Sequence, residues 1–442
     1  MRHTRLTATT AALVTVLVTA GALALTGCAS SGGGGAAGGK VTITFWDDNG
    51  GPERTPIYSH LIAQFEQQNP GIMVKYVGIP IDSVQQKYDT AIAGGAPPDV
   101  GGATTSFLSD LIGQSALAPL DSQLNQSGLN GKLVKSFTDA VRQAAPDGKL
   151  YEIPAAANMD VLWYRADWFK QAGLTAPRTW DDFLADAQKL TDKGKNRYGY
   201  TVRGGSGAIF QLLADMYSYS GVSSFFTPSG TSTIDDPRNV TAIAKLAALY
   251  GKDTPKADVD NGYPQMVAEF DGGSAAMMHH NLGSYTDHVK ALGGSNVAAV
   301  PLPMGPSGHY TVVDNPVDGF VMFKSSPHQA QDWKFIQFLT SRQSNSYWNQ
   351  KAGEIPANTD ASGDAWVQRE APVKMTAQVL SDPATTTLEP PYYLPQFSAI
   401  TKTDMAPLFQ KVLLGQLSAQ AFATKFAQEM TQAQQDWLKH HH

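Results

Sequence analysis

Four short segments of the sequence concentrate side chains that can bind a small polar molecule. Each combines glycine with polar, charged or aromatic residues, and they span residues 47–53, 101–106, 203–207 and 279–285. Carboxylates accept hydrogen bonds, amides donate and accept them, and aromatic rings offer a flat apolar face. Glycine lets the backbone approach a ligand closely. Convergent groups of this kind are typical of a small-molecule binding site.

Motifs for catalysis and metal binding are missing from the sequence. It contains neither a GxSxG nucleophile elbow nor an HExxH zinc motif, and no acidic pair has the context of a hydrolase family. His279 and His280 are adjacent, so in a strand they would face opposite ways and could not share a metal ion. Residues 440–442 are all histidine, as in a purification tag or an unstructured tail. We therefore expect no enzyme, no cofactor and no metal.

The composition is that of an ordinary globular protein. The chain has 442 residues, of which 42% are hydrophobic and 16% charged, and this length favours two domains over one. Lys and Arg total 33 against 39 Asp and Glu, so the net charge is -6. Since no block of basic residues is present to neutralise phosphates, nucleic acid is not an expected partner.

The N-terminus carries the features of a secretion signal. A cationic start with Arg2 and Arg5 precedes an apolar run from Ala8 to Leu25, and small residues precede the only cysteine, Cys28. This arrangement resembles a bacterial lipobox, which implies that residues 1–27 are a cleaved signal peptide and that Cys28 is lipidated. Two or more acyl chains would hold the protein on a membrane. An uncleaved membrane helix with an incidental cysteine is the alternative. Residues 28–39 are rich in Gly, Ser and Ala and predict a flexible tether.

Beyond the tether, short β-branched runs alternate with amphipathic stretches. The first series predicts strands at 41–46, 73–77 and 99–100 and helices at 57–67 and 82–93; the second predicts strands at 160–164 and 198–202 and a helix at 180–191. This alternation favours two α/β lobes, each with a largely parallel sheet. In such sheets ligands bind beyond the carboxyl ends of the strands, which is where the four polar segments fall.

Several short segments occur together in a characteristic order and spacing. They are Ile43–Trp46, Asn69–Ile72, Ala91–Val100, Ile153–Tyr164, Phe169–Phe183, Gly272–Met278, Val300–Gly305 and Trp333–Leu339. Through them, residues 40–437 resemble the family 1 extracellular solute-binding proteins, the sugar-binding components of bacterial ABC importers.

The resemblance implies a two-lobe, periplasmic-binding-protein-like (Venus-flytrap) α/β fold with a hinge of several crossing segments. It places residues 40–153 and 306–355 in lobe one, and residues 154–305 and 356–442 in lobe two. A carbohydrate would be enclosed between the lobes and delivered to ABC permease subunits. Together with the lipobox, this implies a monomer anchored at the extracellular face of the cell membrane.

Candidate ligand contacts in lobe one lie directly after predicted strands. The resemblance places Asp48 and Asn49 at the ligand, with an Asx turn as the alternative. Thr105 and Ser106 follow the strand end at residue 100, where capping of the next helix is an equal alternative. Asp318 precedes a strand that returns to lobe one, and a turn role is equally expected.

Further candidates lie at the crossover and in lobe two. The resemblance places Asn158 at the ligand, and Asp160 shares its side of the strand. Arg203 begins the Gly-rich loop and can bind hydroxyls, a carboxylate or a surface acid. Tyr217 and Tyr392 are aromatic candidates, with core packing as the rival role for each.

The last candidates follow the strand around Ala276 to Met278. The resemblance assigns binding roles to His280 and Asn281. Gly283 stands where several relatives carry tryptophan, so Tyr285 is the expected stacking residue.

Two other function classes compete with import. One is a secreted carbohydrate-active hydrolase, since glycosidases also place carboxylates in a cleft. The other is a sensor or adhesion lipoprotein. Within import, a phosphate ligand would need more than one cation, and Arg203 is the only basic residue expected near the cleft, so a neutral sugar is preferred.

Overall fold

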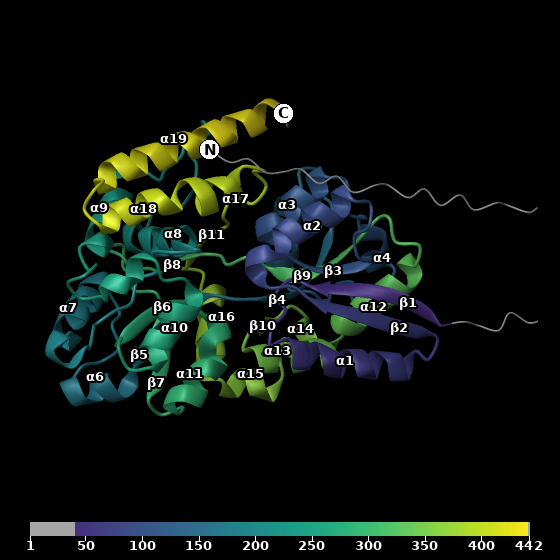
Figure 1. Cartoon of the computed structure of the whole chain (residues 1–442), viewed down its shortest axis with the longest axis horizontal. Coiled ribbons are helices and arrows are strands. Elements are labelled where there is room, and N and C mark those ends of the chain that lie inside the picture. Colours follow the sequence, from purple (N-terminus) through teal and green to yellow (C-terminus); the bar gives the residue numbers. More distant parts are fainter. Residues whose placement is uncertain (1–39, 441–442) are drawn as a thin grey trace, which may run out of the picture. The chain divides into compact units, whose positions relative to one another are not determined.

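The computed structural model describes residues 40–440. The predicted signal peptide, Cys28 and the tether, together with His441 and His442, lie outside the described residues. Among residues 40–440, no helix is both long enough and apolar enough to cross a bilayer. The described chain forms two main sheets, each covered by helices (Figure 1).

The first sheet has six strands and a mixed direction. Its order is β10 (Ile355–Pro356), β4 (Glu152–Ala157), β9 (Asp318–Met322), β3 (Val100–Thr104), β1 (Val41–Asp47) and β2 (Ile72–Gly78). Strand β1 pairs in parallel with β2 and β3, whereas β9 is antiparallel to both β3 and β4. The prediction of a largely parallel sheet is therefore wrong. Strand β9 comes from a remote part of the chain, so no helical crossover forces it to run parallel to its neighbours.

An aromatic core joins this sheet to its helices. In β1, the alternating Ile43 and Phe45 are fully buried. The Phe45 ring contacts Tyr58 edge-on at 5.1 Å and Phe335 at 5.4 Å between centroids. The helices of this part are α1 (Thr55–Gln68), α2 (Val84–Ala93), α3 (Thr105–Gly113), α4 (Asp121–Asn125), α5 (Lys135–Gln143), α12 (Gln329–Leu339), α13 (Arg342–Ala352) and α14 (Thr359–Ser362).

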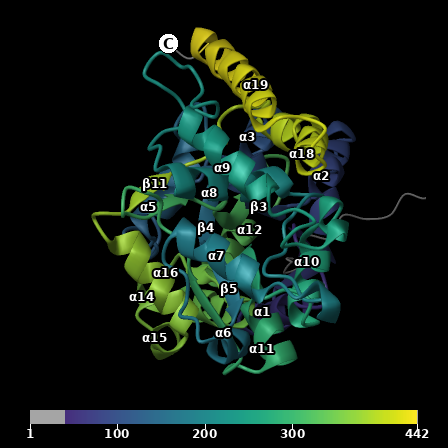
Figure 2. The same cartoon turned by 90° about the vertical axis from the view of Figure 1, so that its left-hand side faces the viewer.

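The second sheet has three antiparallel strands. Strand β5 (Asp160–Arg165) lies between β6 (Met277–Asn281) and β7 (Val297–Pro301). The associated helices are α6 (Ala166–Ala172), α7 (Trp180–Leu190), α8 (Ala208–Ser220), α9 (Pro237–Ala247), α10 (Tyr263–Asp271), α11 (Tyr285–Leu292), α15 (Ala365–Arg369) and α16 (Ala371–Ser381). Helices α17 (Phe397–Ala399), α18 (Ala406–Leu413) and α19 (Ala419–His440) complete the chain, and α19 packs beside α9 (Figure 2).

The predicted strand at 198–202 does not form. Only Tyr198 and Thr201 make isolated bridges, to Ala275 and Met278. Between them the Gly199 amide donates to Thr191 Oγ1 at 3.0 Å. A Cβ on Gly199 would lie 1.9 Å from the Ala187 carbonyl oxygen, so between its two bridges the segment packs tightly against the end of α7.

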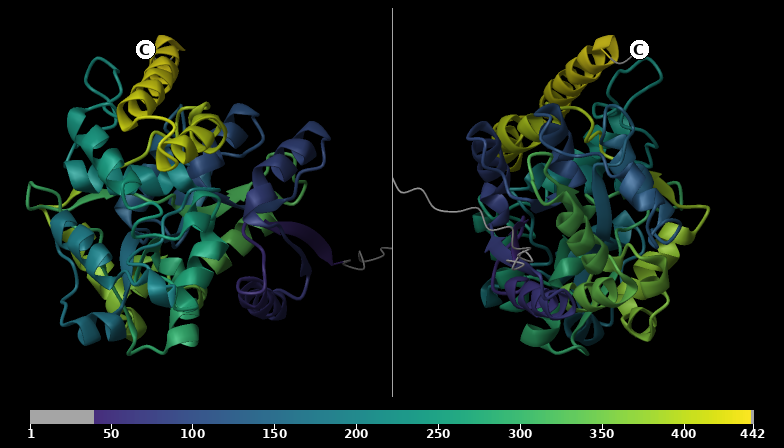
Figure 3. Two further views of the ribbon diagram at one scale, coloured as in Figure 1. Left: turned by 60° about the vertical axis from the view of Figure 1, so that its left-hand side comes forward. Right: turned by 90° about the vertical axis from the view of Figure 1, so that its right-hand side faces the viewer.

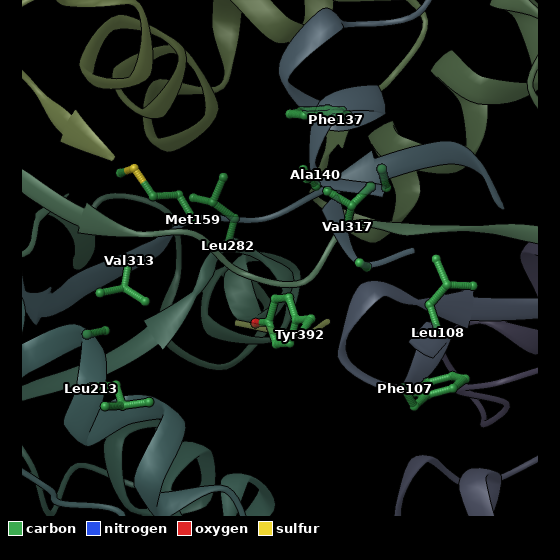
Figure 4. Packing of buried hydrophobic residues seen from close by; sticks show 14 of the residues in the cluster. Phe107, Leu108, Phe137, Ala140, Met159, Leu213, Leu282, Val313, Val317 and Tyr392 are labelled. Atoms are coloured by element: carbon green, nitrogen blue, oxygen red, sulfur yellow. The ribbon is translucent and has the colours of Figure 1, made fainter. Parts of the chain in front are cut away.

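Short segments carry the chain between the two sheets. Residues 158 and 159 separate β4 from β5, and residues 314–317 separate β8 (Thr311–Val313) from β9. Strand β8 pairs in parallel with β11 (Thr386–Leu388). Met159, Val317 and Tyr392, which lie in or near these segments, belong to the buried hydrophobic cluster that Figure 4 shows in part. The lobe boundaries themselves stay a prediction.

The C-terminal helices also lie near helices of the first sheet. Figure 3 shows them beside the α2–α3 region, and Ser398 of α17 donates a hydrogen bond of 3.4 Å to Gln85 of α2. The ring of Phe397 packs edge-on against Phe210 of α8 at 5.9 Å between centroids. Helix α17 therefore contacts elements associated with both sheets.

Candidate functional site

Asp48 lies at the carboxyl end of β1. Its side chain has room only because the neighbouring strand in the sheet, β3, carries a glycine beside it. Its side chain crosses β3, where a Cβ on Gly102 would lie 2.5 Å from Asp48 Oδ1. Asp48 is 5% exposed, and its Oδ2 atom has no hydrogen-bond partner among the described residues. Burial, reinforced by the charge of neighbouring Asp47, raises the pKa of Asp48 to about 7. This carboxyl group is therefore a partly protonated, unsatisfied polar group.

Arg54 supplies the positive charge beside Asp48. It donates to Glu354 Oε1 at 2.9 Å, and its guanidinium lies over the Trp348 ring, 5.0 Å from the centroid. Asp318 also faces Arg54, and burial together with Glu354 raises its pKa well above the ordinary value. The sequence did not point to Arg54 or Glu354 as site residues. Its only hint was that an arginine follows Asp48 by six positions.

A pocket opens between these groups and the helices that cover the first sheet. It is lined by Asp48, Arg54, Tyr58, Leu61, Ala155, Ala156, Asp318, Gly319, Phe320, Leu339, Asn345 and Trp348. Asp48 and Asp318 lie at strand ends, and β4 and β9 also contribute Ala155, Ala156 and Phe320. Helix α1 and the residue before it contribute Arg54, Tyr58 and Leu61, while α12 and α13 contribute Leu339, Asn345 and Trp348. Two predicted residues, Asp48 and Asp318, are thus brought together.

A second group of polar residues gathers at the start of β5. Asp160 Oδ2 lies 3.1 Å from His279 Nε2, and Asp160 Oδ1 accepts a hydrogen bond of 3.0 Å from Asn315. On its other side, His279 Nδ1 lies 2.8 Å from Asp215 Oδ1. Asp160 therefore has a protein partner beside each oxygen, a hydrogen bond at Oδ1 and an ion-pair contact at Oδ2, while its side chain stays 17% exposed.

Arg203 begins the loop before α8 and lies near this group. Its backbone amide donates to Gln211 Oε1 at 3.1 Å, and its Nε donates to the carbonyl oxygen of Ser206. Burial lowers the pKa of the Arg203 guanidinium, while the charges of Asp160 and of Asp82, which precedes α2, oppose this effect. The loop glycines lie tightly against the segment from residue 258 to 261.

The end of β6 contributes an imidazole and two stacked aromatic pairs. His280 stacks on Tyr263, with 4.3 Å between centroids and an interplanar angle of 14°. Burial, and next the charge of Arg203, lowers the pKa of His280 to about 3, so this ring is neutral. Tyr285 stacks on Trp163 at 5.9 Å. Tyr263 was missed because it begins a helix and follows no predicted strand.

Three other candidates, Asn281, Thr105 and Tyr217, have side chains paired with polar groups of the protein. The Asn281 side chain accepts from the Gly283 amide, the Thr105 hydroxyl accepts from the Val317 amide, and the Tyr217 hydroxyl lies 2.8 Å from Thr233. Both Thr105 and Tyr217 are fully buried, as the core alternative for Tyr217 predicts.

Four further predicted residues, Asn49, Ser106, Asn158 and Tyr392, remain to be placed. The Asn49 amide donates to Asp47 Oδ1, which fits the Asx-turn alternative, and the Ser106 hydroxyl lies 2.6 Å from Thr104 Oγ1. Asn158 Oδ1 and the Tyr392 hydroxyl are buried without a hydrogen-bond partner among the described residues. Asn158 and Tyr392 therefore carry unsatisfied polar atoms beside the crossing segments.

Within residues 40–440 no cluster of His, Cys, Asp or Glu has the geometry of a metal site. His279 is 1% exposed and points to Asp215 and Asp160, whereas His280 stacks on Tyr263. The two imidazoles thus lie on opposite faces of the strand, as adjacent strand residues must, and have different neighbours.

Comparison with known proteins identifies the fold and the family. A family profile described as bacterial extracellular solute-binding protein matches residues 51–346. A Brucella abortus protein that carries only the description of a binding protein is 28% identical over 327 residues, 69% of this chain and 73% of that protein. The arabinooligosaccharide-binding protein of Halalkalibacterium halodurans is 22% identical over 328 residues, 70% of each chain.

A solved structure shows the same architecture. The GacH receptor of Streptomyces glaucescens, determined unliganded and with acarbose, has a TM-score of 0.79 and 21% sequence identity. The match covers 90% of this chain and 99% of the receptor. The predicted two-lobe α/β fold is therefore confirmed.

Proposed function

The chain belongs to the bacterial extracellular solute-binding proteins, and from that membership we propose that it captures a neutral carbohydrate and delivers it to an ABC importer. The named relatives support this class of ligand, since one binds arabinooligosaccharides and a structural neighbour binds acarbose. The sugar would lie between the lobes, where strand ends of both sheets present polar side chains.

The observation that carries the proposal is the group formed by Asp160, Arg203 and His280. It combines a carboxylate acceptor, a guanidinium donor and a neutral imidazole, and the Tyr263 ring lies against the imidazole. A sugar requires this mixture, because its hydroxyls both donate and accept and its ring has an apolar face. Each hydrogen bond contributes only about 0.5–1.5 kcal/mol, so micromolar affinity requires many such groups.

The charges in the two lobes favour a neutral ligand over a phosphate. Arg54 is already neutralised, because Glu354 lies 2.9 Å away and Asp48 and Asp318 also face it. Of these two arginines, only Arg203 is left to meet an added anion, and Asp160 and Asp82 partly balance it. A phosphate would need a second free cation to offset its desolvation.

The remaining parts of the proposal concern location and assembly. Lipidation of Cys28 would tether a monomer to the outer face of the cell membrane, close to the permease subunits. The absence of hydrolase motifs from the sequence and the family membership both favour binding without catalysis. Capture would then proceed by closure of the lobes, driven by contacts that exist only in the closed state.

A thermal-shift screen tests the proposal. The full chain is heated with maltose, maltotriose, arabinooligosaccharides, D-tagatose, erythritol and ribitol, and with glycerol 3-phosphate as the anionic control. A sugar that binds only the native state raises the free energy of unfolding by RT ln(1 + [L]/Kd), where [L] is the free sugar concentration, and so raises the melting temperature. We expect a shift with at least one neutral compound and none with the phosphate.

Two results of the screen would count against the proposal. A shift with glycerol 3-phosphate alone would replace the neutral sugar by an anion. Shortening of an oligosaccharide during incubation, detected by chromatography, would instead favour the hydrolase alternative.

A further inference from the structure

His279 is a buried histidine held between two carboxyl groups. Its ring nitrogens lie 2.8 Å from Asp215 Oδ1 and 3.1 Å from Asp160 Oδ2, and its side chain is 1% exposed. The strand pairing explains the geometry, since Asp160 lies opposite Asn281 in β6, which makes His279 its diagonal neighbour. Asp215 reaches the ring from helix α8.

The arrangement favours a doubly protonated ring. A neutral imidazole leaves one nitrogen lone pair beside a carboxylate, whereas an imidazolium carries a proton on each nitrogen and a positive charge between the two acids, both of which lie within ion-pair distance. Burial alone would lower the pKa of His279, but the charges of Asp215 and Asp160 outweigh it and raise the pKa to about 10. Burial would likewise raise the pKa of Asp160, yet the charge of His279 holds it below the ordinary value.

Asp160 is fixed from the opposite side as well. Its Oδ1 atom accepts from Asn315, which lies on the segment between β8 and β9. The carboxylate therefore has both oxygens oriented, and it retains lone pairs for a further donor because each oxygen can accept two hydrogen bonds. Four other titratable groups interact electrostatically with Asp160: Arg203, His280, Tyr200 and Tyr392.

We propose that His279, anchored by Asp215, is a positioning residue that keeps the Asp160 carboxylate charged and correctly oriented to accept a ligand hydroxyl. The role of Asp160 at the ligand rests on the proposed function, whereas the charge state of His279 does not. The charge of the Asp160 carboxylate then does not change with pH across the neutral range, because the buried His279 imidazolium beside it compensates that charge.

The charge state is tested on the full chain without any sugar. The protein is labelled with ¹⁵N-histidine, and the ring nitrogen shifts of His279 are followed from pH 5 to 9, with H279Q used to assign the signals. We expect both nitrogens to remain protonated throughout. In D215N the ring should lose a proton within this range. A neutral wild-type ring at pH 7, or a ring unaffected by D215N, overturns the proposal.

The consequence for binding is tested by repeating the neutral sugar panel at pH 5.5 and pH 8. In H279Q the uncompensated Asp160 should take up a proton at pH 5.5, so affinity measured by titration calorimetry should fall about tenfold relative to pH 8, the factor expected for losing a charged acceptor. The wild type should change little.

H288Q is the matched control for this experiment. His288 is a fully buried histidine with Nδ1 2.7 Å from Asp271, but it does not contact Asp160, so its variant should keep the wild-type profile. A flat profile in H279Q would assign His279 a purely structural role. If H279Q does not fold, D215N takes its place. If no panel sugar binds the wild type, the proposed function fails and the nitrogen shifts alone decide the state of His279.

Discussion

The two polar groups, one around Arg54 and one around His279, differ in how their charges are balanced. Around Arg54, one guanidinium faces Asp48, Asp318 and Glu354, so negative groups are in excess. Around His279, one imidazolium lies between two carboxyl groups. Excess carboxyl groups in a buried site must bind protons near neutral pH, whereas a compensated carboxylate stays ionised. The first group is therefore sensitive to pH, and the second is protected from it.

Removing the single cation of the first group should have the largest effect. In R54M, Glu354 is left as a buried acid without its ion-pair partner. We expect the free energy of unfolding to fall by about 3–5 kcal/mol at pH 8, as for other broken buried pairs. Urea denaturation measures it. R142Q, which breaks the part-exposed pair with Asp121, serves as control and should cost no more than about 1 kcal/mol. Equal losses in both variants would contradict the importance of Arg54.

Crowding the Asp48 carboxylate should have the next largest effect. In G102A, the new Cβ would lie 2.5 Å from Asp48 Oδ1, and the carboxylate would have to move. We expect a loss of about 1–3 kcal/mol by urea denaturation, the usual range for overpacking. G113A adds the same methyl group where nothing lies within 4 Å, and it should not destabilise. A stable G102A would mean that Asp48 is free to reorient.

The pH dependence of the first group is a smaller effect with a definite sign. The pKa of Asp48 is raised to about 7 in the folded state, so the folded chain binds more protons than the unfolded chain between about pH 4 and 7. This carboxyl group contributes its full stabilisation below its unfolded pKa and loses it as pH rises through about 7. A difference of one bound proton between the folded and unfolded chains changes the free energy of unfolding by about 1.4 kcal/mol per pH unit.

The variant D48N should therefore lose less stability than the wild type when the pH rises from 5 to 7. Urea denaturation at the two pH values compares their slopes. D147N, an exposed carboxyl variant whose wild-type pKa is lowered, is the control and should not reduce this slope. Parallel slopes in D48N and the wild type would show that Asp48 is ionised at both pH values.

Loss of the aromatic stack in the second group should have the smallest effect. In Y263L, the ring that lies 4.3 Å from His280 is removed, and we expect sugar affinity to fall about two- to tenfold, from the 0.5–1.5 kcal/mol of an aromatic pair. Titration calorimetry measures it. Y347L removes a tilted ring contact with His60, at 4.6 Å between centroids, and should leave sugar affinity unchanged. An equal loss in both variants would remove Tyr263 from the site.

The structure brings several of the candidate residues together in two groups. Asp48 and Asp318 meet in one group, and Asp160, Arg203 and His280 lie near one another. The period-two pattern also separated His279 from His280. Whether these residues touch a sugar stays a prediction.

The partners of those residues could not be predicted. Arg54 and Glu354 are 300 positions apart, and Asp215 belongs to a helix that reads as core from its sequence. No local pattern reports a distance of this kind. The same holds for the direction of β9, which enters the first sheet from a segment more than 150 residues after β4 ends.

The sequence by itself determined most of the α/β elements, the family and several polar residues at strand ends, because these depend on local periodicity and short motifs. Only the tertiary structure decided which charges meet, since burial and pairing between remote segments set the ionisation of each group. A carboxylate on a strand end is therefore readable from sequence, but its charge at neutral pH is a property of the folded chain.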